Sequence, residues 1–352
     1  MPETEPHILF ETRGPLGLIT LNRPKALNAL THGMCIGMRK TLLEWDKDSA
    51  IRAVAIRGLG PRAFCAGGDI RAMADSSSDK TPAAANFLRD EYRLNGLIGA
   101  FSKPYVALIH GVVMGGGAGV SVHGSYRLAD DDLAFAMPET GIGFIPDIGA
   151  SYFLSRCPGE TGIYLALTGT RIGLGDALAL GLMTHRVAAS DHEALIARVA
   201  AGEAPANAIA SFARAAPLSP MAEHRSLIDR VFVASSVEAV LERLDRDGSD
   251  FASQTARLIR TRSPTSLKLA FALVRRGKDL SRNECLKMEY RVGSRVVMGH
   301  DFREGVRALI TDKDGRPRWE PWALAAVTER DIAGYFAPLG AREPSFADNA
   351  AE

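Results

Sequence analysis

Two glycine-rich segments carry the first residues whose types suggest chemistry. Residues 64–70 read FCAGGDI, and residues 110–119 read HGVVMGGGAG. Each segment follows an apolar run, so each can place a backbone N–H group at the end of a strand. Two such groups directed at one carbonyl oxygen form an oxyanion hole, which suits acyl or enolate chemistry. Tight turns with close helix packing use glycine as well, and for either segment alone that interpretation is favoured.

A third segment, residues 137–147 (MPETGIGFIPD), contributes two carboxylates. Glu139 lies among apolar neighbours, where burial raises a carboxyl pKa toward neutrality and prepares the group for acid–base work or nucleophilic attack. The alternative is a glutamate that points outward at a turn. Asp147 is a candidate second carboxylate, and its alternative role is the N-cap of a helix over residues 148–155.

A further carboxylate, Glu91, falls on the apolar face of a predicted helix. That helix spans residues 83–101, and Glu91 lies four residues after Phe87 and three before Leu94. Residues at this spacing share one helix face. Since glutamate is seldom fully buried without a partner, Glu91 either pairs with an arginine or lines a pocket.

The composition is that of a globular protein without an obvious charged partner. The 352 residues are 46% hydrophobic and 24% charged, and their formal net charge is +1. A neutral chain gives no general case for binding nucleic acid or a membrane, and no apolar run reaches the roughly 18 residues of a membrane span. The polar N-terminus resembles neither a signal peptide nor a transit peptide. Four cysteines without a C-x-x-C pair, and histidines without metal spacing, predict a cytoplasmic protein with no metal.

The order of the predicted elements favours an α/β core followed by helices. A hairpin is expected at 8–13 and 16–21, a helix capped by Thr31 follows, and a polar loop is expected at 76–82. Further strands are predicted at 53–57, 105–109, 126–129 and 133–136, and later helices at 222–232, 236–247, 265–276 and 281–297. This order predicts repeated β-β-α units. We divide the chain into a core at residues 1–190 and a helical C-terminal region at residues 191–352.

The charge is distributed unevenly along the chain. Residues 257–318 contain 16 Lys or Arg against 7 Asp or Glu, a net of +9, so the remainder of the chain sums to −8. We favour a solvated helical face that docks on an acidic core. The alternative is a surface that faces a phosphorylated ligand.

Together with residues 22–30 (NRPKALNAL), the three segments resemble the crotonase superfamily, also called the enoyl-CoA hydratase/isomerase family. The resemblance implies a fold of stacked β-β-α turns and an acyl-CoA substrate. It also implies that the N–H groups of Gly68 and Gly116 form the oxyanion hole around the thioester carbonyl.

One departure from the family pattern bears on the reaction. Hydratases of this family carry a catalytic glutamate where this chain has Gly119, while their other glutamate matches Glu139. The chain is instead similar to the branch that hydrolyses 3-hydroxyisobutyryl-CoA. The segments that carry this similarity are 89–92 (RDEY), 105–111, 120–124, 136–154, 263–267 and 301–305. The substrate-contact positions implied by that branch are Glu91, Gly116, Glu139 and Asp147.

The resemblance therefore implies hydrolysis of a short 3-hydroxyacyl-CoA, with a place in valine breakdown. Glu139 would attack the carbonyl or activate water, and Asp147 would bind the 3-hydroxyl group or orient water. Coenzyme A is part of the substrate, and no separate cofactor is expected. The alternatives are an enoyl-CoA hydratase or isomerase, and a non-catalytic binding protein, including an RNA-binding one. Association into oligomers through the helical regions is a further expectation.

Overall fold

Two sheets form the first half of the molecule. In the computed structural model, which describes residues 6–78 and 83–346, the larger sheet has the strand order β1-β2-β3-β5-β7-β9 and the smaller one the order β4-β6-β8. The strands are β1 (Ile8–Arg13), β2 (Leu16–Leu21), β3 (Ala53–Gly58), β4 (Ala63–Cys65), β5 (Tyr105–Ile109), β6 (Val112–Met114), β7 (Tyr126–Ala129), β8 (Ala134–Ala136) and β9 (His185–Arg186). Only the β1–β2 pair is antiparallel among the strand pairs of the described residues.

The helices are distributed along the whole chain. They are α1 (His32–Lys47), α2 (Ile70–Ser78), α3 (Ala83–Ala100), α4 (Gly116–Gly119), α5 (Ala150–Leu154), α6 (Thr161–Thr168), α7 (Leu174–Ala179), α8 (His192–Ala200), α9 (Pro205–Phe212), α10 (Arg225–Phe232), α11 (Val237–Asp247), α12 (Asp250–Arg260), α13 (Pro264–Gly277), α14 (Arg282–Val296), α15 (His300–Val306) and α16 (Glu329–Phe336). Two shorter pieces bear on the site, the 3₁₀ turn η2 (Glu139–Ile142) and the π-helical turn η5 (Arg307–Thr311).

The strands alternate between the two sheets along the chain, which confirms the predicted β-β-α repeat. Strands β3, β5 and β7 enter the larger sheet, and each is followed by a short strand of the smaller sheet. Strand β5 is entirely apolar and fully buried, as expected for a central parallel strand covered on both faces. Because β4, β6 and β8 run parallel, their carboxyl ends lie at one edge, and Gly68, Gly116 and Glu139 follow these ends closely.

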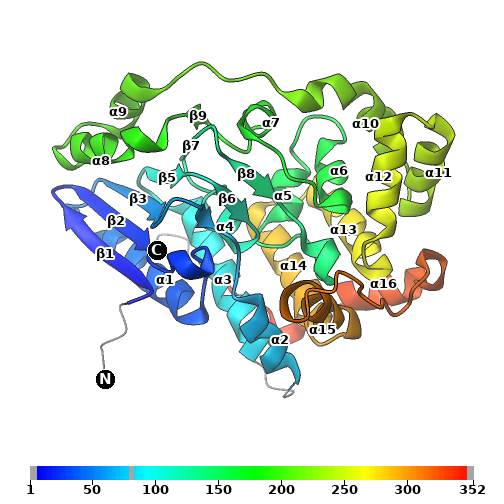
Figure 1. Cartoon of the computed structure of the whole chain (residues 1–352). Helices are drawn as coiled ribbons and strands as arrows, with labels where there is room; N and C mark the ends of the chain where they lie inside the picture. The colour runs from blue at the N-terminus through cyan, green and yellow to red at the C-terminus, as the bar shows by residue number, and fades with distance from the viewer. Residues whose placement is uncertain (1–5, 79–82, 347–352) are drawn as a thin grey trace.

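The helices after β9 cover the core in two groups. Helices α8 and α9 share an apolar cluster with strands of the larger sheet, whereas later helices pack on α3, α5 and α6. Figure 1 shows the strands in the left half of the view and α10, α11, α12 and α16 in the right half. Helix α14 packs against α3 and α5, and α13 packs against α5 and α6. One buried apolar cluster includes residues from both sides of position 190, such as Tyr92 and Val292. The predicted boundary at position 190 lies just after the last strand, β9. The division into two domains stays a prediction.

Two local expectations differ from the structure. The polar stretch predicted as a loop at 76–82 is helical as far as Ser78, and residues 79–82 lie outside the described part of the chain. Helix α5 begins at Ala150 rather than at 148, because Ile148 (φ +58°) and Gly149 (φ +89°) both have left-handed backbone conformations that a helix cannot contain.

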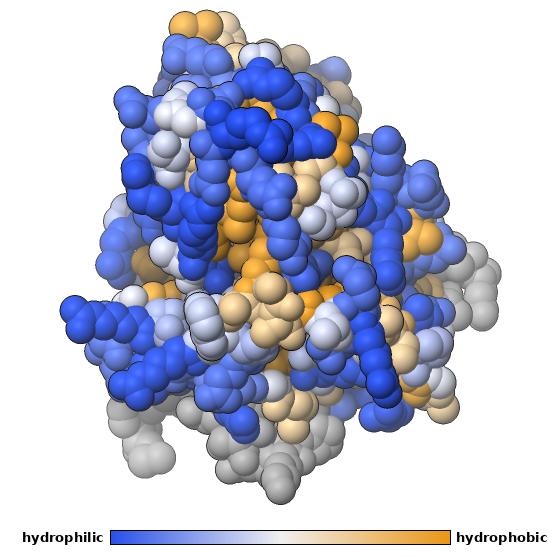
Figure 2. Space-filling model, turned by 90° about the vertical axis from the view of Figure 1, so that its right-hand side faces the viewer, coloured by the Kyte–Doolittle hydropathy of each residue, from blue (hydrophilic) through white to orange (hydrophobic). Residues whose placement is uncertain are grey.

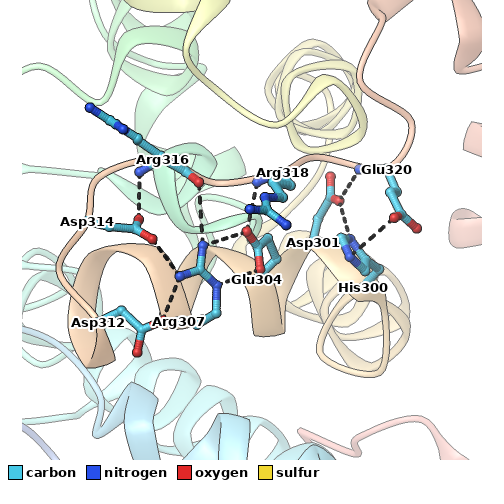
Figure 3. Close-up of polar contacts among 9 residues, drawn as sticks. All are labelled: His300, Asp301, Glu304, Arg307, Asp312, Asp314, Arg316, Arg318 and Glu320. Atoms are coloured by element: carbon cyan, nitrogen blue, oxygen red, sulfur yellow. Dashed lines mark hydrogen bonds and ion pairs between the residues drawn. The ribbon is translucent and has the colours of Figure 1, made fainter.

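Cations of the basic segment pair with carboxylates. Figure 3 shows Arg307 between Glu304, Asp312 and Asp314, with donor–acceptor distances of 2.7–2.8 Å. Other pairs are Arg260–Asp245, Lys268–Glu238, Arg275–Glu160 and Arg291–Glu343. Figure 2 shows the face that lies at the right-hand side of Figure 1. Hydrophilic side chains cover most of it, around a narrow apolar strip. These contacts support the interpretation as a solvated helical face. Its docking on an acidic core stays a prediction, since of the carboxylates named here only Glu160 belongs to residues 1–190. No helix in residues 6–78 and 83–346 is long and apolar enough to cross a membrane.

Candidate active site

The three segments singled out in the sequence meet at one cavity of about 200 Å³. All five predicted site residues line it: Gly68, Glu91, Gly116, Glu139 and Asp147. The rest of the wall is mostly apolar, and among the described residues no lysine, arginine or histidine belongs to it. The cavity therefore combines two backbone amides with three carboxyl groups in surroundings of low polarity.

The two glycine amides lie next to each other. Gly68 follows β4 and Gly116 opens α4 after β6, and these strands are paired in parallel. A Cβ atom built on Gly116 would lie 3.2 Å from the Gly68 nitrogen, and one built on Gly67 would lie 3.8 Å from the Gly116 nitrogen. Within the described residues neither N–H group has a recorded hydrogen-bond acceptor. Two adjacent, unpaired donors at a cavity wall can bind one carbonyl oxygen.

Glu139 is buried beside these amides. It opens the turn η2 after β8 and is only 6% exposed. Its Oε2 atom has no hydrogen-bond partner among the described residues. A Cβ atom built on Gly115 would lie 3.1 Å from Glu139 Oε1, so the carboxyl group lies against the second glycine-rich segment. Burial, and to a smaller extent the charge of Asp147, raises the pKa of Glu139 well above its ordinary value. The alternative of an outward-pointing glutamate is wrong.

Glu91 faces the cavity from α3. It is 3% exposed, and within the part of the chain that the structure describes its Oε1 atom has no hydrogen-bond partner. Oε1 lies 2.5 Å from where a Cβ atom on Gly116 would be. Burial and the charge of Asp147 raise the pKa of Glu91 well above its ordinary value. No ion pair joins Glu91 to an arginine in residues 6–78 and 83–346, so the structure favours the pocket interpretation over the salt bridge.

Asp147 is held by a tyrosine that the sequence analysis did not single out. The Tyr92 hydroxyl donates a 2.7 Å hydrogen bond to Asp147 Oδ2, and both side chains are buried. Burial raises the pKa of Asp147 to about 7, although the hydrogen bond from Tyr92 opposes the rise. The N-cap role is wrong, because the residue at the α5 cap is Gly149. Tyr92 follows Glu91 in the RDEY segment, and its helical position alone carried no signal for this contact.

The three carboxyl groups influence one another. Asp147 is among the causes that raise the pKa of both glutamates, and Glu91 contributes to the rise at Glu139. Because the described part of the cavity wall supplies no cation, three negative charges cannot be held together at low cost. The cavity therefore raises the pKa values of all three carboxyl groups, a shift toward the range in which acid–base chemistry operates.

The C-terminal half completes the wall with two residues that the sequence analysis did not find. Phe302 on α15 and Ile310 on η5 line the cavity, and the Phe302 ring lies 5.4 Å from that of Phe144. The Ile310 carbonyl accepts a hydrogen bond from Arg71 on α2. Since these residues are more than 150 positions beyond η2, no local pattern indicates their contact with the site.

The described residues contain no group of three or more His, Cys, Asp or Glu side chains placed to hold a metal ion. The expectation that coenzyme A enters as part of the substrate and that no separate cofactor is required stays a prediction.

Comparison with known proteins identifies the family. A family model described as enoyl-CoA hydratase/isomerase matches residues 16–336. The chain belongs to the enoyl-CoA hydratase/isomerase family. Curated relatives in this family include the mitochondrial 3-hydroxyisobutyryl-CoA hydrolases of Danio rerio, 45% identical over 96% of this chain and 91% of theirs, and of Homo sapiens, 41% identical over 96% and 90%.

Solved structures of the family superpose closely on this chain. A structure titled as a carnitinyl-CoA dehydratase from Mycobacterium thermoresistibile has a TM-score of 0.93 and 42% identity, over 97% of this chain and 99% of that one. Another, titled as an enoyl-CoA hydratase from Rhodobacter sphaeroides, has a TM-score of 0.91 and 36% identity, over 97% and 100%. The predicted crotonase-type fold is thus confirmed.

The expectation of a cytoplasmic location is wrong. The curated relatives of this family member are named as mitochondrial proteins. The prediction rested on four cysteines without a pairing pattern, and all four are free and buried in the structure. Free thiols indicate a reducing environment and do not say which compartment provides it, so cysteine content was not a sufficient basis.

Proposed function

We propose that this family member hydrolyses the thioester of 3-hydroxyisobutyryl-CoA, or of a similar short 3-hydroxyacyl-CoA, to the free acid and coenzyme A, a step of valine breakdown. Relatives named for this reaction cover almost the whole chain. The observation that carries the proposal is the position of Glu139. A buried carboxyl group without a hydrogen bond to its Oε2 atom lies beside two unpaired backbone N–H groups.

In the proposed reaction, the N–H groups of Gly68 and Gly116 bind the thioester carbonyl oxygen and stabilise the negative charge that develops on it. Glu139 acts on the carbonyl carbon. It either attacks this carbon, which expels the coenzyme A thiolate and gives a mixed anhydride that water then cleaves, or it takes a proton from a water molecule that attacks directly. Both routes require the ionised carboxylate of Glu139.

We assign Asp147 to the 3-hydroxyl group of the substrate. Asp147→Ala removes an acceptor for that hydroxyl and leaves the Tyr92 hydroxyl without its partner. We expect kcat/KM to fall by about 10²-fold or more for a 3-hydroxyacyl-CoA, because a buried polar group that loses its partner discriminates strongly. Plain acyl-CoA of the same length should lose far less. Thiol release from the two substrates measures the difference, and equal losses would remove the proposed role of Asp147.

A second candidate function comes from the solved structures, whose titles name a dehydratase and a hydratase. The local structure at Gly119 argues against it for this chain. A Cβ atom there would lie 2.8 Å from Asn95 Nδ2 and 3.0 Å from Ile148 Cβ. The space for the second glutamate of a hydratase is therefore filled by other side chains, and addition of water to a double bond would lack half of its acid–base pair.

Release of free thiol from a panel of acyl-CoA esters tests the proposal. Hydrolysis frees the coenzyme A thiol, whereas hydration, dehydration and isomerisation leave the thioester intact. We expect the fastest release from 3-hydroxyisobutyryl-CoA and slower release from plain isobutyryl-CoA. Loss of enoyl absorbance without thiol release would support the hydratase candidate instead. No turnover of any ester would support a non-catalytic binding protein.

A further inference from the structure

A buried glutamate in the C-terminal half has no part in the reaction described above. Glu289 on α14 is fully buried and accepts three hydrogen bonds. Its Oε2 atom accepts from the Gly149 N–H at 2.6 Å, and its Oε1 atom accepts from the Ser151 N–H at 2.7 Å and the Ser151 hydroxyl at 2.5 Å. Burial raises the pKa of Glu289, and these hydrogen bonds oppose the rise because they favour the carboxylate. Its partners begin two residues after Asp147.

The turn that Glu289 binds has an unfavourable backbone conformation. Ile148, a β-branched residue, has φ +58°, and Gly149 has φ +89°. A left-handed conformation is unfavourable for a residue with a Cβ atom, and it persists only where the surroundings impose it. Without anchors, residues 147–149 would relax to another conformation and the carboxyl group of Asp147 would change direction.

Two other anchors hold the same turn from the N-terminal half. His123 Nε2 lies 2.7 Å from the Ile148 carbonyl oxygen. Burial lowers the pKa of His123 to about 3, so the ring is neutral and donates its Nε2 proton to this carbonyl. The Tyr92 hydroxyl holds the Asp147 carboxyl group itself. Glu289 is the polar anchor that the C-terminal half supplies within the described residues.

We propose that Glu289 is a positioning residue for Asp147. By binding the N–H groups of Gly149 and Ser151, it fixes the turn that directs the Asp147 carboxyl group toward the acyl part of the substrate. Glu289 does not line the cavity, so its effect reaches the reaction through Asp147. The inference rests on the proposed function, since it assigns to the C-terminal half a part in the selection of 3-hydroxyacyl substrates.

The test is Glu289→Gln, which keeps the size of the side chain but turns an NH₂ group toward N–H donors. We expect kcat/KM for 3-hydroxyisobutyryl-CoA to fall by about 10²-fold, the usual effect of a misplacement near 1 Å. Isobutyryl-CoA should lose much less, as for Asp147→Ala. The matched control is Asp176→Asn. Asp176 is also buried, and it accepts hydrogen bonds from the Met221 N–H and the Ser219 hydroxyl. The Asp176→Asn variant should leave the ratio of kcat/KM for the two substrates unchanged.

A double-mutant cycle separates positioning from general loss of stability. In the Asp147→Ala background, Glu289→Gln should change neither substrate's rate appreciably, because the group it positions is gone. Equal losses for both substrates, or a full additional loss in that background, would overturn the proposal. If Glu289→Gln does not fold, Ser151→Ala removes one of the three donors, and it must then shift the substrate ratio in the same direction. Failure of the proposed function is distinct, since the unmodified protein would then release no thiol.

Discussion

Glu139→Gln should abolish thioester hydrolysis while the chain remains folded. Glutamine has the shape of glutamate but cannot attack as an anion or accept a proton, so we expect kcat to fall by about 10²–10⁴-fold on 3-hydroxyisobutyryl-CoA. Thiol release measures the loss, and circular dichroism with a thermal melt checks the fold. Near-normal turnover in a folded Glu139→Gln variant would remove the proposed mechanism.

The same variant has an expected signature in stability. Burial raises the pKa of Glu139 in the folded state above its unfolded value of about 4.3. Between these two values the unfolded chain releases a proton that the folded chain keeps, so the unmodified protein loses stability as pH rises. Glutamine does not titrate. The free energy of unfolding of the variant, relative to the unmodified protein, should therefore increase from pH 4 to pH 8. Denaturant unfolding at the two pH values measures it, and a relative decrease would show that the buried carboxylate is stabilised by a partner.

Isotope labelling distinguishes the two routes that Glu139 can take. In a single turnover in ¹⁸O-labelled water, only an anhydride intermediate can transfer labelled oxygen into the Glu139 carboxyl group. Mass spectrometry of the peptide that contains residue 139 detects it. Because Glu139 Oε1 lies against the second glycine-rich segment, the structure places the carboxyl group where a carbonyl bound by Gly116 would be within reach. Label in the peptide would establish the anhydride route.

The site could be predicted from the sequence where its residues follow parallel strands. Gly68, Gly116 and Glu139 come shortly after β4, β6 and β8, whose carboxyl ends share one edge, so their convergence follows from the strand order. Glu91 was indicated because it is a charged residue on an otherwise apolar helix face. These are local patterns, and one fold rule joins them.

The remaining contacts join residues that are far apart in the sequence, so no local pattern indicates them. Glu289 is 140 positions from Gly149, and Phe302 is farther still from the segments that it covers. A helix cap was the alternative role considered for Asp147, because an aspartate before a helix usually is one. Its real environment depends on Tyr92 and on the left-handed conformation of Ile148, which is a packing result and not a preference of isoleucine.

Gly116→Ala should reduce hydrolysis nearly as strongly as the loss of Glu139. The added Cβ atom would lie 2.5 Å from Glu91 Oε1 and 3.2 Å from the Gly68 nitrogen, in the space that the substrate carbonyl must enter. Removal of one oxyanion-hole donor costs about 10²–10³-fold in kcat, and here the methyl group obstructs both donors at once. We expect a loss of at least that size for every acyl-CoA ester, because all of them share the thioester carbonyl.

The control for this substitution is Gly33→Ala. Gly33 lies in the first turn of α1 with nothing within 4 Å of the added Cβ atom, so the variant should keep its activity. An alanine in a helix is favoured over glycine by about 1 kcal/mol, so the thermal midpoint of the Gly33→Ala variant should rise slightly.

A comparison of Gly116→Ala with Asp147→Ala separates the role of the two carbonyl-binding amides from that of the carboxyl groups. Gly116→Ala should affect plain and 3-hydroxyacyl esters alike, whereas Asp147→Ala distinguishes them. A Gly116→Ala variant that loses only 3-hydroxyacyl activity would place the thioester carbonyl away from Gly116, and the oxyanion hole would have to be sought elsewhere in the cavity.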